Sequence, residues 1–319
     1  MGLLIDGVWS DEQPASGKAD GHYLRPDSQF RNWVTADGSS GFPAEAGRYH
    51  LYIAINCPWA HRTWIFRILK RLTDVVSMSV VAPRSTPQGW MFDESRPQYR
   101  DTLLGKRYLH EVYTLAQPHY TGRVTVPVLW DKQRRTIVNN ESPEILRMFN
   151  SAFNALTGDT TDYYPEPLRA EIDALNDLTY RTVNNGVYRA GFATTQEAYD
   201  EAVATVFATL DRLEARLATQ RYLCGNQLTE ADWRLFPTLV RFDAAYYGAF
   251  KCNLRRLVDY PNLWAYTREL YQLPGIAETV DLEVYKQGYY SPSPLRNPLG
   301  IVPKGPIIDF TTPHGRAAL

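Results

Sequence analysis

Cys57 is the side chain in this sequence that is best placed to act as a nucleophile. The run RYHLYIAI before it alternates apolar residues as a strand does, and the segment that follows Pro58 has helical spacing. A thiol between a strand end and a helix start faces free N–H groups and the positive end of the helix dipole, which should lower its pKa. Because the thiolate is the reactive form, this position favours thiol chemistry at neutral pH.

Two other roles for Cys57 remain open. It could be a small buried residue of the core, since free cysteine is among the most buried residue types. It could also join His61, one helical turn later, in a metal site. Two side chains supply only half of a zinc site, so we expect His61 to lie on the helix surface instead.

Pro127, in the stretch TVPV, is a second unusual feature. Proline at the beginning of a central strand is rare, because it cannot donate a backbone hydrogen bond to the sheet. A cis Val126–Pro127 peptide bond that faces Cys57 would explain its presence. An edge strand, where the missing donor does no harm, is the alternative.

The composition excludes several other classes of protein. The chain has 319 residues with 34 basic and 35 acidic side chains, and this balance gives no electrostatic sign of nucleic-acid binding. No apolar run reaches the roughly 20 residues that span a membrane, and the first residues lack the basic region of a signal peptide. Cys-x-x-Cys pairs and the common phosphate-loop, dinucleotide and serine-hydrolase motifs are absent. We therefore expect a cytoplasmic protein with no metal, no nucleic-acid partner and no membrane segment.

The hydrophobic patterns around Cys57 predict the order strand–helix–strand, a long insert, then strand–strand–helix. The last helix of this series should have Ser142 as its N-cap and Pro143 at its first position. From about residue 165 the spacing changes to that of long helices, and one of them opens with a capping-box pattern at Thr229–Asp232. The predicted organisation is an extended N-terminal arm of little regular structure at 1–46, an α/β domain at 47–160 with an insert at 83–123, an all-helical domain at 161–285, and an ordered C-terminal strap at 286–319.

These features together resemble the glutathionyl-hydroquinone reductases, the Xi class of the glutathione transferase family. The strand–Cys57–Pro58–helix unit, Val126–Pro127 and Glu141–Ser142 follow one another as in the thioredoxin-like fold of that family. The resemblance implies an α/β thioredoxin-like N-terminal domain, an all-α glutathione-transferase C-terminal domain, glutathione as co-substrate, and a homodimer. It covers nearly the whole chain, in the blocks SSGFPAE, CPWAHR, TGRVTVPVLWD, NNESPEI, NNGVYRAGFATTQEAY, LTEADWRLFPTLVRFD, FKCNLRRL and IVPKGP.

By this resemblance, Cys57 is the catalytic thiolate of a reaction that removes glutathione from glutathionyl-hydroquinones. It would form a mixed disulfide with glutathione and release the hydroquinone. A second glutathione would then regenerate the thiol and leave as glutathione disulfide. No other cysteine is near Cys57 in the sequence, so an external thiol suits this last step. Cys224 and Cys252 are expected to be structural.

The resemblance also implies five glutathione-binding residues. Glu141 and Ser142 would hold the γ-glutamyl end, since a carboxylate can bind its ammonium group and a hydroxyl with helix N–H groups can bind its carboxylate. Val126 would pair its backbone with the cysteinyl part, and Trp90 and Arg123 would help to bind the tripeptide. Helix capping for Ser142, core packing for Trp90 and a solvated cation for Arg123 are the alternative roles.

Tyr188 and Tyr289 match tyrosines that line the hydroquinone pocket of the family, where a phenol can hydrogen-bond the substrate and help to protonate the leaving carbon. In a chain with 21 tyrosines, ordinary core packing is the alternative. The family often has histidine at the positions of Ala249 and Gly288, which leaves the exact hydroquinone open. Two further functions also stay open: an omega-type thiol transferase or dehydroascorbate reductase, and a non-catalytic phenol-binding protein.

Overall fold

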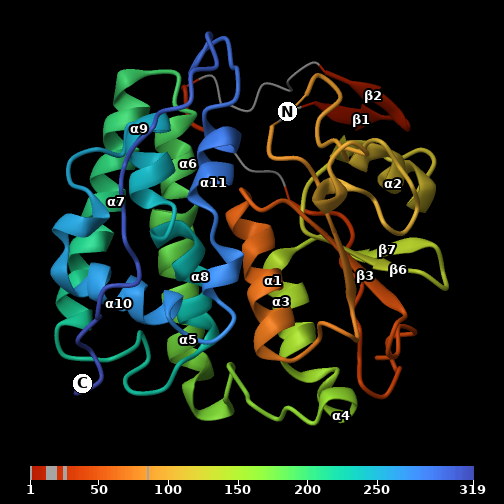
Figure 1. Cartoon of the computed structure of the whole chain (residues 1–319), viewed down its shortest axis with the longest axis horizontal. Coiled ribbons are helices and arrows are strands. Elements are labelled where there is room, and N and C mark those ends of the chain that lie inside the picture. Colours follow the sequence, from red (N-terminus) through yellow and green to blue (C-terminus); the bar gives the residue numbers. More distant parts are fainter. Residues whose placement is uncertain (1, 12–19, 24–26, 85) are drawn as a thin grey trace. The chain divides into compact units, whose positions relative to one another are not determined.

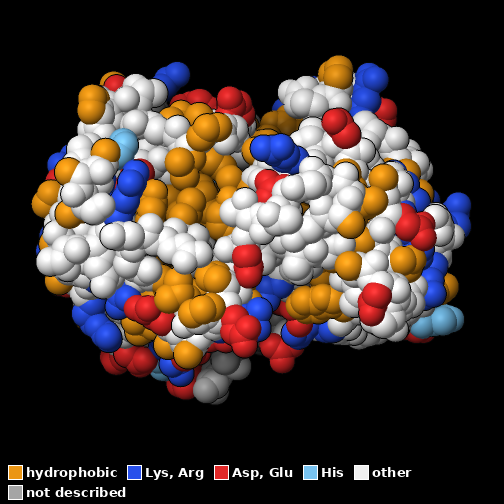
Figure 2. Space-filling model, turned by 90° about the horizontal axis from the view of Figure 1, so that it is seen from below, with side chains coloured by type: hydrophobic (Ala, Val, Ile, Leu, Met, Phe, Trp, Pro, Cys, Tyr) orange, Lys and Arg blue, Asp and Glu red, His pale blue; other side chains and the backbone are white. Residues whose placement is uncertain are grey.

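The chain divides into two compact units in the computed structural model, which describes residues 2–11, 20–23, 27–84 and 86–319. One unit comprises residues 1–15 and 26–161, and the other comprises residues 16–25 and 162–319. Over the face that Figure 2 presents, acidic and basic side chains are intermingled, in keeping with the formal net charge of -1. Within the described ranges, no helix is long and apolar enough to cross a membrane.

The first unit is built on a four-stranded sheet in the order β4-β3-β6-β7. Strand β3 pairs parallel to β4 and antiparallel to β6, which pairs antiparallel to β7. Figure 1 shows helices α1 and α3 next to each other on one side of this sheet, and these two helices pack together. The predicted order of strands and helices is therefore confirmed. The bounds are β3 Tyr49–Ile53, α1 Pro58–Leu69, β4 Ser77–Val80, β6 Val128–Asp131, β7 Thr136–Asn139, α3 Ser142–Ser151 and α4 Asn154–Thr157.

Strand β3 is buried along its whole length, so both of its faces need partners. Its apolar side chains pack in the core, and its one histidine, His50, lies between two serines of β4. The His50 Nδ1 is 2.7 Å from the Ser77 Oγ, and its Nε2 is 3.0 Å from the Ser79 Oγ. Both ring nitrogens are therefore hydrogen-bonded, which makes burial of this polar group acceptable.

The predicted N-terminal arm contains more regular structure than expected. Strands β1 (Leu3–Ile5) and β2 (Val8–Ser10) form a hairpin, and β1 also pairs with β5 (Gly122–Arg123) at the end of the insert. Asp6 and Gly7 make the two-residue turn with φ values of 49° and 77°. An Asp-Gly turn between two apolar runs is a strong hairpin signal, and the prediction of an extended arm with little regular structure overlooked it.

The insert carries the 3₁₀ turn η1 (Pro97–Tyr99) and helix α2 (Leu109–Ala116). Helix α2 opens with a capping box in which the Glu111 side chain accepts a hydrogen bond from the Tyr108 N–H at 2.8 Å. The separation of the arm, the insert and the C-terminal strap as distinct domains stays a prediction.

The second unit is mostly helical. Its longest helix, α7, packs against α6 and α10. The expected capping box is present at the start of α8, where the Asp232 carboxylate accepts a hydrogen bond from the Thr229 N–H at 2.8 Å. The elements are η2 Glu166–Leu168, α5 Arg169–Thr179, the π-helical turn η3 Tyr180–Asn184, α6 Gly186–Gly191, α7 Gln196–Leu217, α8 Glu230–Leu239, the π-helical turn η4 Phe242–Tyr246, α9 Tyr247–Ala249, η5 Leu257–Asp259, α10 Pro261–Tyr271, η6 Ala277–Thr279 and α11 Leu282–Tyr289.

The segment after α11 has no regular helix but is tied to the second unit by side-chain hydrogen bonds. Near its end, the buried Arg316 guanidinium donates to the carbonyls of Leu217 at 3.0 Å and Gln220 at 2.6 Å. The Gln272 side chain donates to the Phe310 carbonyl at 2.8 Å, and the Phe310 ring is buried. These contacts hold the C-terminal segment against α7 and α10.

Candidate active site

Cys57 is the N-cap residue of helix α1, directly before Pro58, and it is half-buried. The Val126–Pro127 bond is cis, and β6, which follows it, is not an edge strand, so of the two explanations left open for this proline the cis bond is the right one. The Cys57 Sγ lies 3.6 Å from the Val126 carbonyl oxygen, so the thiol and the cis bond face each other. The arrangement places a thiol at the positive end of a helix dipole, where a thiolate is stabilised.

His61 is buried, with 1% of its surface exposed, so the expectation that it lies on the helix surface was wrong. Polar residues of helix α1, such as Arg62 and Thr63, are buried along with its apolar ones. The helix is therefore covered on more than one side. An expectation based on one apolar face fails for such a helix. Among the described residues, no group of three or more His, Cys, Asp or Glu side chains could hold a metal ion.

Helix α3 starts one residue earlier than predicted: Glu141 is its N-cap and Ser142 its first residue. The Glu141 carboxylate accepts a hydrogen bond from the Ser28 hydroxyl at 2.9 Å. The Ser142 hydroxyl is buried and, among the described residues, has no hydrogen-bond partner. It therefore does not cap the helix. A buried hydroxyl without a partner at a helix N-terminus suits an anionic ligand.

Trp90 and Arg123 lie at the two ends of the insert region. Trp90 is half-buried, and its carbonyl accepts a hydrogen bond from the Leu109 N–H at 3.0 Å. Arg123 belongs to β5, and its Nε is buried without a hydrogen-bond partner among the residues that the structure describes. An unpaired buried guanidinium N–H again suits a polar ligand. The part that either residue plays in glutathione binding stays a prediction.

Tyr188 and Tyr289 are brought together in the second unit, with their hydroxyl oxygens 2.8 Å apart. A third hydroxyl, that of Tyr246, lies 3.0 Å from the Tyr289 hydroxyl. Burial raises the pKa of Tyr289 well above its usual value, with Tyr188 and Tyr246 acting in the same direction and Arg241 opposing them. Tyr289 is therefore a neutral phenol that can donate a hydrogen bond at neutral pH.

Tyr246 is the residue of this cluster that the sequence did not reveal. It is fully buried and ends the π-helical turn η4, which leads directly into α9. Single-turn π-helices are frequent at functional sites, but no sequence pattern marks them. In the aromatic-rich run FDAAYYGAF, neither residue type nor spacing distinguishes Tyr246 from Tyr247.

The other two cysteines differ from Cys57 in their surroundings. Both are free and buried. Burial raises the pKa of the Cys224 thiol to about 11 and that of the Cys252 thiol to about 12. At neutral pH both remain protonated and unreactive, in line with a structural role.

In comparisons with known proteins, each half of the chain matches a protein-family model. Residues 56–152 match the family model described as glutathione S-transferase, N-terminal domain, and residues 196–269 match glutathione S-transferase, C-terminal domain. The chain is 54% identical to the glutathionyl-hydroquinone reductase YqjG of Escherichia coli K12, over 99% of this chain and 98% of that protein. It is 51% identical to the glutathionyl-hydroquinone reductase PcpF of Sphingobium chlorophenolicum, over 96% of each.

Solved structures agree with these relatives. The glutathione-bound structure of YqjG matches with a TM-score of 0.91 at 53% identity, covering 99% of each chain. The Xi-class glutathione transferase of Natrialba magadii matches with a TM-score of 0.94 at 48% identity, covering 100% of this chain and 97% of the other. The expected fold class, a thioredoxin-like α/β domain followed by an all-α glutathione-transferase domain, is therefore confirmed.

Proposed function

This chain belongs to the glutathionyl-hydroquinone reductases, the Xi class of the glutathione transferase family, and on that premise we propose that it reduces glutathionyl-hydroquinones to hydroquinones with glutathione. The observation that supports this function best is the position of Cys57, at the start of α1 and opposite the cis Val126–Pro127 bond. A thiol, unlike a hydroxyl, can form and break a disulfide with glutathione.

In the proposed first step, the Cys57 thiolate attacks the sulfur of the glutathionyl-hydroquinone. An S–S bond forms, the bond between sulfur and the ring carbon breaks, and its electron pair stays on the ring carbon, which takes up a proton. The products are the hydroquinone and a mixed disulfide of Cys57 with glutathione. The thiol has thus been oxidised and the ring reduced by two electrons.

In the second step, the thiolate of a second glutathione attacks the glutathione sulfur of this mixed disulfide. Glutathione disulfide leaves, and the Cys57 thiolate is regenerated. Cys224 and Cys252 are buried and protonated, so neither is suited to resolve the mixed disulfide in place of external glutathione.

The ring carbon needs a proton donor, and we assign this role to Tyr188 and Tyr289. Their hydroxyls are hydrogen-bonded to each other, and the raised pKa of Tyr289 keeps it protonated. A phenol of this kind can also hold a hydroxyl of the substrate by a hydrogen bond.

Five residues of the first unit are proposed to bind glutathione. Ser142 and Arg123 have buried donor atoms without partners among the described residues, which fits the carboxylates of the tripeptide. Glu141 at the N-cap of α3 would bind the γ-glutamyl ammonium group. The Val126 backbone, beside the Cys57 thiol, would pair with the cysteinyl part, and Trp90 would pack against the peptide.

The deciding experiment is a single turnover followed by intact-protein mass spectrometry. Mixing the protein with glutathionyl-menadiol should give a glutathione adduct on Cys57 and free menadiol, and added glutathione should remove the adduct. Cys57→Ser should abolish turnover. An adduct that forms only from a simple glutathione mixed disulfide, or from glutathione with dehydroascorbate as the oxidant, would favour an omega-type thiol transferase. Phenol binding without any adduct would favour a binding protein.

We also propose that the protein is cytoplasmic, as its composition suggests, and that it is a homodimer, as the family resemblance implies. Light scattering should give about twice the chain mass of 36.5 kDa. A mass equal to that of one chain would overturn the dimer.

A further inference from the structure

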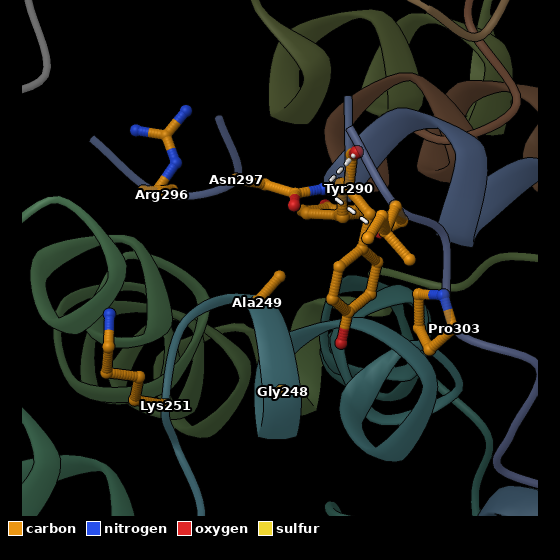
Figure 3. A pocket seen from close by; sticks show the side chains of 9 residues that line it. Gly248, Ala249, Lys251, Tyr290, Arg296, Asn297 and Pro303 are labelled. Carbon is orange, nitrogen blue, oxygen red and sulfur yellow. Dashed lines mark hydrogen bonds between the residues drawn. The ribbon is translucent and has the colours of Figure 1, made fainter. Parts of the chain in front are cut away.

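A cavity of about 260 Å³ lies within the second unit, beside Tyr289. It opens to the surface where three segments meet: the end of α9 with the turn after it (248–251), the end of α11 (289–290), and the C-terminal segment 296–303 (Figure 3). Because Tyr289 is one of the proposed proton donors, a ligand in this cavity would contact a residue of the proposed reaction.

The cavity has a cationic side. Figure 3 shows Lys251 and Arg296 on one side of it, Tyr290 and Pro303 on the other, and Ala249 between them. Among the residues that the structure describes, no aspartate or glutamate lines it. The Arg296 guanidinium lies 4.1 Å from the centre of the Phe192 ring, which orients its plane. Two cations without a carboxylate favour an anionic ligand, and a planar guanidinium is well suited to a carboxylate.

The walls of the cavity are fixed by hydrogen bonds. The Asn297 side chain donates to the Tyr290 carbonyl at 2.6 Å and to the Ile301 carbonyl at 3.1 Å, as the dashed lines in Figure 3 show. The Ala249 backbone hydrogen-bonds to the Tyr290 hydroxyl. The α11 end is thus joined to both of the other segments that line the cavity, which reduces the cost of ordering them around a ligand.

The backbone of Lys251 is also held in place, while the residue itself is exposed. Its backbone has a positive φ of 58°, a conformation that is uncommon for a lysine. Its carbonyl accepts a hydrogen bond from the Tyr199 hydroxyl at 2.6 Å. Such backbone conformations cost free energy and occur often at ligand sites.

The volume indicates the size of the chemical group that the cavity can hold. A cavity of about 150 Å³ can hold benzene, so 260 Å³ has room for a single ring with small substituents. We propose that this cavity binds an aromatic carboxylate, and that the preferred substrates are glutathionyl-hydroquinones with one ring and a carboxylate on it. This inference rests on the function proposed above and names the substrate class for it.

The test compares two substrates that differ only in the carboxylate: glutathionyl-2,5-dihydroxybenzoate and the unsubstituted glutathionyl-hydroquinone. The kcat/KM ratio between them is measured at constant ionic strength for the wild type and for Lys251→Gln/Arg296→Gln. We expect the wild type to favour the carboxylate at least tenfold and the double variant to lose about tenfold of that ratio. Lys304→Gln, an exposed lysine just beyond the cavity wall, should leave the ratio unchanged.

A second variant tests the proposal by reducing the space inside the cavity. Ala249→Leu places a larger side chain between the two sides of the cavity and should lower kcat/KM for the carboxylated substrate more than for the neutral one. Equal kcat/KM values for the two substrates in the wild type would overturn the inference. So would a ratio of these kcat/KM values that neither the double variant nor Ala249→Leu changes.

If neither substrate is turned over, the proposed function fails, but the cavity can still be tested. Calorimetric titration of 2,5-dihydroxybenzoate should then show binding to the wild type and weaker binding to Lys251→Gln/Arg296→Gln. No binding, or equal binding to both proteins, would overturn the cavity proposal independently.

Discussion

The hydroxyl of Tyr246 lies 3.0 Å from the hydroxyl of Tyr289 in the second unit. Because Tyr289 also bonds to Tyr188 at 2.8 Å, its hydroxyl takes part in two hydrogen bonds at once. Tyr246 is fully buried, so its effect on the reaction would be exerted through Tyr289, as a positioning residue. A hydroxyl held between two others polarises them both and has little freedom to turn away.

Tyr246→Phe should therefore lower kcat without weakening substrate binding. Loss of one hydrogen bond of about 1 kcal/mol predicts a kcat about five- to tenfold lower, with KM for glutathionyl-menadiol within about twofold. Steady-state kinetics checks this. The exchange between Cys57 and a simple glutathione mixed disulfide needs no proton on carbon and should not change.

Tyr285→Phe is the matched control, because Tyr285 lies on the same helix as Tyr289 and donates its hydrogen bond to the Thr279 carbonyl instead. If both variants lose kcat to the same extent, or if Tyr246→Phe keeps full activity, the positioning role is wrong.

Ser142→Ala should weaken glutathione binding with little effect on stability. The hydroxyl caps no helix and has no partner among the described residues, so its removal costs the folded protein little. A hydrogen bond to a charged carboxylate contributes about 1.5–3 kcal/mol, which predicts a KM for glutathione at least tenfold higher. Ser151→Ala at the other end of α3 is the control. An unchanged KM would remove Ser142 from the glutathione site.

Cys57 should be the thiol that iodoacetamide modifies in the native protein at pH 7. The start of α1 stabilises its thiolate, whereas burial holds the pKa of Cys224 at about 11 and that of Cys252 at about 12. Peptide mass spectrometry should find Cys57 labelled first. As the pH is raised, its rate of labelling should reach a plateau below pH 8. Labelling of Cys252 at the same rate, or a Cys57 rate that still rises above pH 8, would contradict this.

His50 should make the stability of the protein depend on pH. Burial lowers the pKa of His50 from 6.5 to about 3, and Lys132 and Arg67 act in the same direction. Between these values the unfolded chain binds a proton that the folded chain does not. The free energy of unfolding should therefore fall as the pH drops below 6.5, by up to about 1.4 kcal/mol per pH unit.

Urea unfolding of the wild type and of His50→Gln between pH 4 and pH 7 isolates this effect. The variant should have a smaller slope of stability against pH, while His119→Gln, at an exposed histidine, should keep the wild-type slope. Equal slopes for wild type and His50→Gln would show that His50 is not the group responsible.

The sequence predicted the core of the first unit well, because its strands and helices have strong, short-range patterns. The alternation before Cys57 and the prolines at 58, 127 and 143 mark the boundaries of elements almost to the residue. The N-cap of α3 was misplaced by one position, since Glu141 and Ser142 are both plausible there until the backbone is known.

The features that the sequence did not predict depend on contacts between distant residues. The burial of His61 follows from how α1 is covered, and the Tyr246–Tyr289 bond joins positions 43 residues apart. The cavity beside Tyr289 needs the C-terminal segment to return against α9, which no local pattern specifies. For Tyr188 and Tyr289 it was the family resemblance, not residue type, that separated them from the other tyrosines.

The pairing of β1 with β5 has a practical consequence for anyone who modifies the N-terminus. Leu3 lies opposite Arg123, so the first strand of the chain supports the backbone of a residue proposed to bind glutathione. Trimming the first ten residues, or fusing a rigid partner directly before Leu3, would disturb the pairing of β1 with β5 and so the backbone position of Arg123. A flexible spacer ahead of Leu3 is the safer choice for purification or immobilisation.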